Sequence, residues 1–111
     1  MVFNNQELEV TNEEFEKIIK NSSKKIVIVD FFAEWFMPCL MMSPIIDDLS
    51  HNFKEARFVK INVDDNSDIS NKYKITTLPC IVFFKNGKEF CRIVGSRSAD
   101  FIENKIKKFL D

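Results

Sequence analysis

Few side chains in this sequence can do covalent chemistry, and the most informative is the cysteine that ends the run Trp-Phe-Met-Pro-Cys, Cys39. Cys39 falls just inside the start of a predicted helix. A thiol there is either a single-thiol nucleophile or site of reversible capping, or, when buried, a small unreactive apolar residue. Earlier in the chain, Asp30 stands in the apolar run Ile-Val-Ile-Val-Asp-Phe-Phe, where a lone carboxylate is costly unless it is paired or protonated.

Other kinds of site find little support. His51 is the chain's only histidine and has no matching cluster of cysteine, aspartate or histidine, so no metal site is predicted. One histidine leaves little room for a Ser-His-Asp arrangement, and two glycines cannot make a glycine-rich phosphate loop. Sixteen basic residues face seventeen acidic ones, without the basic excess that nucleic-acid binding requires. We expect no cofactor and no nucleic-acid partner.

Length and composition indicate one globular domain over residues 1–111. Residues 1–10 are polar and carry no apolar segment of a secretory signal. No apolar stretch approaches the roughly 20 residues of a membrane helix. Three cysteines are an odd number, which argues against a structural disulfide framework. The expectation is a cytoplasmic monomer without membrane contact.

The first half of the chain predicts a helix, a buried strand and a long helix. A capping-box sequence, Thr-Asn-Glu-Glu, starts a helix at about residue 12 that ends within residues 21–23. Residues 25–32 form a β-branched run without alternation, typical of a strand buried on both faces. A long helix is expected over about residues 36–53, with Met41 and Met42 in the core.

The second half predicts two strands and two helices around a tight hairpin. Residues 56–63 form a second buried strand, and a short helix follows over residues 66–73. A third strand over residues 80–85 leads into an Asn-Gly pair, a strong hairpin signal, and a partner strand over residues 89–94. Ser98 caps the last helix.

This order of elements indicates an α/β fold. The early alternation of strands and helices implies parallel pairing, and the terminal hairpin adds antiparallel strands. The pattern over residues 3–9 is compatible with a further strand. The expected architecture is a central mixed β-sheet flanked by helices on both faces.

The element order and several motifs at matching spacing resemble the thioredoxin family over nearly the whole chain. The motifs lie at residues 29–39, 58–64, 77–80, 84–87 and 94–95. The family motif is Trp-Cys-x-Pro-Cys, but here the position of its first cysteine holds Phe36. In the family that cysteine is the nucleophile, whose thiolate is stabilised at the start of the long helix. Phenylalanine has no atom that can form the mixed disulfide.

The resemblance also implies roles for other residues. Asp30 matches the family's buried acid, the proton acceptor for the resolving cysteine at Cys39, and Lys60 matches a lysine near that acid. Without the nucleophile, these three residues are either vestigial or the catalytic group of an atypical site. Pro79 matches the family's cis-proline, whose loop lies against the motif. Cys80 is therefore a candidate redox partner for Cys39, if their Cα atoms lie within about 7 Å, or else a core strand residue.

By the same resemblance, a face around the motif binds a peptide or protein partner. Its residues are Trp35, Phe36, Met37, Pro38, Leu78 and Pro79. Phe36 is expected to be partly exposed rather than folded inward as a plug, and an exposed apolar patch is typical of an interaction site. The loop before the third strand would leave backbone groups free for pairing with an extended peptide.

The predicted function is that of a thioredoxin-like member of the thiol–disulfide oxidoreductase family that is inactive in ordinary disulfide exchange and keeps its partner-binding face. Two alternatives stay open. One is an atypical oxidoreductase that uses Cys39 alone or with Cys80. The other is an ordinary family member in which Phe36 replaces a native cysteine.

Overall fold

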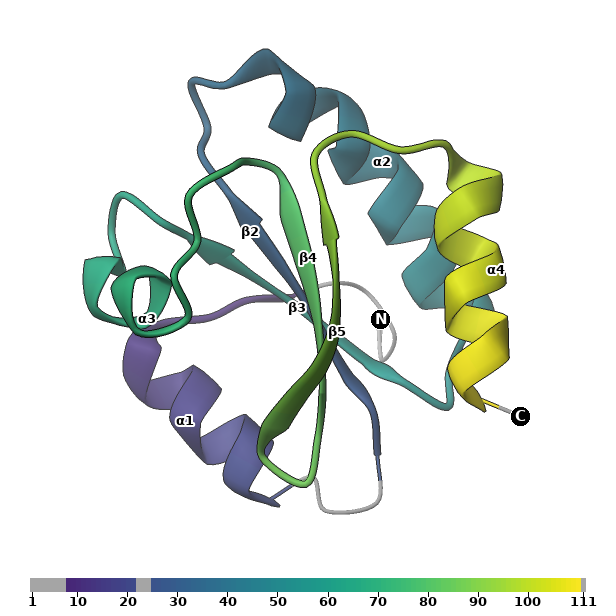
Figure 1. Ribbon diagram of the computed structural model, residues 1–111, viewed down its shortest axis with the longest axis horizontal. Coiled ribbons are helices and arrows are strands. Elements are labelled where there is room, and N and C mark those ends of the chain that lie inside the picture. The colour runs from purple at the N-terminus through teal and green to yellow at the C-terminus, as the bar shows by residue number, and fades with distance from the viewer. Residues whose placement is uncertain (1–7, 22–24, 111) are drawn as a thin grey trace, which may run out of the picture.

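The strands of the computed structural model form a five-stranded mixed sheet (Figure 1). The structure describes residues 8–21 and 25–110. The spatial order is β1-β3-β2-β4-β5. The strands are β1 (Leu8–Glu9), β2 (Val27–Phe32), β3 (Arg57–Asn62), β4 (Cys80–Lys85) and β5 (Lys88–Val94). The strand suggested near residues 3–9 is thus seen only at its end, and its remainder lies outside the described residues.

Strand pairing agrees with the expected mixture of directions. β3 pairs in parallel with β1 and with β2, whereas β4 is antiparallel to both β2 and β5. The hairpin between β4 and β5 turns at Asn86 and Gly87, which both have positive φ values, 54° and 77°. Positive φ at both central residues is what a type I′ turn requires and explains the Asn-Gly pair.

Helices cover both faces of the sheet, which confirms the α/β architecture. Figure 1 shows α1 and α3 on one side and α2 and α4 on the other. The helices are α1 (Asn12–Asn21), α2 (Met37–Asn52), α3 (Ser67–Lys72) and α4 (Ala99–Leu110). Within the part of the chain that the structure describes, no helix is long and apolar enough to cross a membrane.

Two apolar cores lie between these layers, because successive side chains of a buried strand point to opposite faces. In β4, Cys80 belongs to the core under α1 and α3, and the next residue, Ile81, belongs to the core under α2 and α4. The same alternation holds in β2, where Val29 joins the first core and Ile28 joins the second. Both faces of β2 and β4 are therefore buried, as the runs of apolar residues in these two strands predicted.

The buried stripe of α2 differs from the prediction at one residue. The stripe consists of Cys39, Met42, Ile46 and Leu49, spaced three or four residues apart as helix geometry requires. Met41 lies about 100° around the helix from Met42 and is 67% exposed. The prediction that Met41 belongs to the core is therefore wrong, whereas Met42 is buried as predicted.

Candidate functional site

The site begins where β2 ends and the chain turns into α2. Phe36 is the N-cap of α2, with extended backbone angles and no side-chain capping bond. Its carbonyl accepts hydrogen bonds from the amides of Cys39 at 3.0 Å and Leu40 at 3.3 Å. A phenyl ring cannot accept a bond from the free amides of the first turn, as a polar N-cap does. Phe36 therefore contributes only its backbone to the helix start.

The side chain of Phe36 forms an aromatic pair with Trp35. Their ring centroids are 5.5 Å apart with the planes tilted by 58°. Trp35 is 72% exposed and Phe36 is half-buried, as expected for a partly exposed ring. The Trp35 indole Nε1 donates to Oδ2 of Asp64 at 2.8 Å, and the Asp64 amide in turn donates to the side chain of Asn62. These two hydrogen bonds hold the Trp35 ring, and with it the aromatic pair, beside the end of β3.

Asp64 was not assigned a role from the sequence, although a signal was present. It follows β3, which is parallel to and directly beside β2. The carboxyl ends of neighbouring parallel strands meet at one edge of the sheet, so a polar side chain there faces the loop after β2. This relationship was available once β2 and β3 had been predicted to pair.

Cys39 lies in the first turn of α2 and is 3% exposed. Burial raises the pKa of its thiol above the ordinary 9.0, and the negative charge of Asp30 acts in the same direction. A backbone hydrogen bond with Ala33 opposes these effects without reversing them. At neutral pH the sulfur is therefore a protonated thiol rather than a thiolate.

The structure brings Cys39 together with Asp30 and Lys60. All three line a cavity of about 160 Å³ that also includes Glu34 and Ser43. Asp30 and Lys60 are direct register partners on β2 and β3, and Asp30 is 3% exposed. The Lys60 ammonium lies 5.4 Å from the ring centroid of Phe32. Glu34 and Ser43 were not singled out from the sequence, because no local pattern marks them as cavity residues.

The loop before β4 carries Leu78 and Pro79, the remaining residues predicted to bind a partner. The Leu78–Pro79 peptide bond is cis, as the resemblance predicted. Pro79 is buried and Leu78 half-buried, while Met37 on α2 is 61% exposed. The carbonyl of Pro79 accepts a hydrogen bond from the Gly95 amide at 2.8 Å, which ties this loop to the end of β5.

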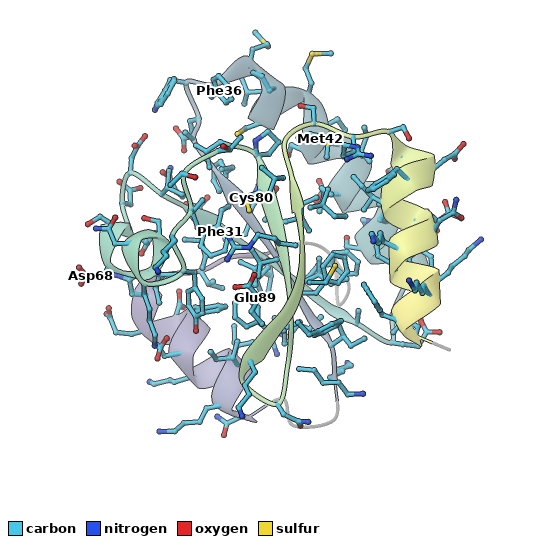
Figure 2. All side chains as sticks on the ribbon, in the orientation of Figure 1. Phe31, Phe36, Met42, Asp68, Cys80 and Glu89 are labelled. Carbon is cyan, nitrogen blue, oxygen red and sulfur yellow. The ribbon has the colours of Figure 1, made fainter. Side chains whose placement is uncertain are left out.

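Cys80 does not join Cys39. Its side chain belongs to the core under α1 and α3, whereas Cys39 belongs to α2 on the opposite face of the sheet. Figure 2 shows Cys80 within the sheet and Phe36 at the end of the molecule where α2 begins. Burial raises the pKa of the Cys80 thiol, although the nearby Arg92 guanidinium acts in the opposite direction. All three cysteines, Cys91 included, are free thiols.

Comparisons with known proteins agree with this geometry. The Thioredoxin family model matches residues 6–108. A thioredoxin from Chlamydia pneumoniae is 36% identical over 99 residues, which cover 89% of this chain and 94% of that protein. A thioredoxin from Mycoplasma genitalium is 51% identical over 74 residues, covering 67% and 72% of the two chains. The crystal structure of Schistosoma mansoni thioredoxin is 34% identical and superposes with a TM-score of 0.87, covering 96% of this chain and 97% of that one.

A buried thiol in the first turn of α2, a cis bond before Pro79 and a mixed sheet between two helical layers thus accompany a match over most of the sequence. The chain belongs to the thioredoxin family.

Proposed function

We propose that this protein binds an extended apolar segment of a protein partner and does not catalyse ordinary disulfide exchange. The binding surface, called the partner face below, consists of Trp35, Phe36, Met37, Pro38, Leu78 and Pro79. The observation that carries the proposal is the phenyl ring at the N-cap of α2, where disulfide exchange needs a sulfur atom.

The chemistry of exchange explains why this one residue matters. A thiolate must attack a disulfide sulfur and form a mixed disulfide before a second thiol can resolve it. Phe36 offers no attacking atom. Cys39 is 3% exposed, and its pKa is raised by burial, so it supplies neither the access nor the thiolate that the first step requires.

The partner face has the composition of a binding surface. Trp35 is 72% and Met37 61% exposed, and the half-buried ring of Phe36 lies between them in the sequence. Exposed apolar clusters of this kind are typical of protein interaction sites. Tryptophan is frequent among the residues that dominate binding energy, and methionine adapts its shape to different partners.

A second candidate function is single-thiol chemistry at Cys39, an atypical oxidoreductase. The cavity of about 160 Å³ beside Cys39 favours it, because a small reactant there would meet Asp30 and Lys60 as well as the sulfur. A pair of Cys39 with Cys80 is not favoured, since the two side chains belong to opposite faces of the sheet.

Trp35 allows a direct test of binding, because it is the chain's only tryptophan and is 72% exposed. Titration with a short leucine-rich peptide should shift its fluorescence to shorter wavelength as the indole is covered. The Phe36→Ser variant should bind about tenfold more weakly. Phe90→Ser, which makes the same change at a phenylalanine on β5 that is 43% exposed, is the matched control. An unchanged emission spectrum, or equal weakening by both variants, contradicts the proposal.

The proposal also takes the protein to be a monomer in the cytoplasm. Three free thiols suit a reducing compartment. Sedimentation at micromolar concentration should give the mass of one chain, 13.0 kDa. A dimer, or recovery of the protein from an oxidising compartment, contradicts the corresponding part of the proposal.

A further inference from the structure

An apolar groove of about 440 Å³ lies next to the partner face, between α2 and the loop that joins β5 to α4. Figure 2 shows Met42 where α2 passes this loop. The groove residues are Met37, Pro38, Met41, Met42, Ile45, Ser96 and Arg97. Because Met37 and Pro38 also belong to the partner face, the groove continues that face along α2.

The loop between β5 and α4, which forms one side of the groove, is hydrogen-bonded to the part of the partner face that contains Pro79. The Gly95 amide donates to the Pro79 carbonyl at 2.8 Å, and Ser96 and Arg97 follow directly in the chain. A peptide bound along Pro79 and Met37 would therefore lie close to Ser96 and Arg97.

Arg97 is the one charged side chain among the groove residues. Its guanidinium carbon lies 3.7 Å from the ring centroid of Phe101, which fixes the group over the first turn of α4. The Phe101 amide is itself bound to the Ser98 hydroxyl at 3.1 Å. A guanidinium stacked on a ring keeps N–H groups at its edge that can bind a carboxylate through two parallel hydrogen bonds. Arg97 forms no ion pair with any carboxylate of residues 8–21 and 25–110.

We propose that the groove takes a large apolar side chain of the partner and that Arg97 binds a carboxylate beside it. The preferred partner is thus a protein segment in which an acidic residue is next to a large apolar one. The inference rests on the proposed function, since it names the partner of the same face. Thioether side chains select loosely among apolar shapes, so the charge at Arg97 supplies most of the selectivity.

The overall charge of the protein does not favour acidic ligands. The chain has a formal net charge of −1, so long-range attraction does not select a negative peptide. A preference for acidic segments must therefore arise locally, and a change at Arg97 should remove it while the same change elsewhere should not.

Fluorescence anisotropy with two labelled peptides tests the inference. Both peptides carry a central leucine, which is followed by two aspartates in the acidic peptide and by two lysines in the basic one. We expect the acidic peptide to bind about tenfold more tightly at low salt. Arg97→Glu should reverse the preference, and Met41→Ser should weaken both peptides. Lys88→Glu makes the same charge change on β5, outside the groove, and should leave the preference unchanged.

The outcomes separate this inference from the proposed function. Equal binding of both peptides, or an acidic preference that survives Arg97→Glu, overturns the inference while the observed binding still supports the partner face. A loss of preference in Lys88→Glu as large as in Arg97→Glu also overturns it. If neither the acidic nor the basic peptide binds, the proposed function and the inference are both contradicted.

Discussion

The amide of Cys39 donates a hydrogen bond to the carbonyl of Phe36 at 3.0 Å. The residue at the family's nucleophile position and the remaining motif thiol are thus held in one helical turn. Phe36 is half-buried, whereas Cys39 is 3% exposed. The start of α2 therefore presents an aromatic ring next to a buried thiol, which is the arrangement on which the proposed function rests.

The reactivity of Cys39 follows from this burial. Iodoacetamide should label Cys39 at least about tenfold more slowly in the folded protein than in denaturant, because burial excludes the reagent and disfavours the thiolate. Cys91 is half-buried and serves as an internal comparison that labels faster. Mass spectrometry of the digested protein measures both sites. Labelling of Cys39 as fast as that of Cys91 in the folded protein would contradict the account.

The raised pKa of Cys39 also predicts how stability depends on pH. The unfolded thiol has the ordinary pKa of 9.0 and the folded thiol a higher one, so the unfolded chain loses its proton first. The contribution of this thiol to stability is complete below pH 9.0 and falls as pH rises through the folded pKa. Urea unfolding at about pH 8 and about pH 10 should show a smaller decrease in Cys39→Ala than in the unaltered protein. An equal decrease in both proteins contradicts the assignment.

Most of the fold was predictable because its signals are local. The capping-box sequence gives α1 its start at Asn12, and the β-branched runs and the Asn-Gly turn give β2, β4 and β5. The bounds of β4 agree with the sequence prediction, because the turn fixes one end and Pro79 precedes the other.

The site was only partly predictable, because its geometry depends on contacts between distant segments. Local sequence singled out Cys39 and Asp30, but their roles and the place of Lys60 beside them came from the family resemblance, and no local pattern gives their shared cavity. The groove beside Arg97 forms where α2 meets a loop far along the chain, which a single sequence does not reveal. The misassignment of Met41 has a simpler cause: adjacent residues of a helix point about 100° apart, so the burial of Met42 did not require that of Met41.

Met41 and Met42 therefore form a matched pair for a stability measurement. Met42 is 3% and Met41 67% exposed. Met42→Ala should lower the free energy of unfolding by about 2–5 kcal/mol through lost burial and a cavity, whereas Met41→Ala should change it by about 0.5 kcal/mol or less. Chemical denaturation measures both. Comparable losses in the two variants would contradict the orientation of α2.

Reduction of insulin by dithiothreitol tests the central claim most directly, namely that Phe36 removes disulfide-exchange activity. The Phe36→Cys variant should accelerate the reaction, because Trp35, Pro38, Cys39 and Pro79 remain in place around the new thiol. Phe36→Ser is the matched control, since it removes the ring without adding sulfur. We predict that the unaltered protein and Phe36→Ser stay at the uncatalysed background rate. Insulin reduction by the unaltered protein as fast as by Phe36→Cys would contradict the account.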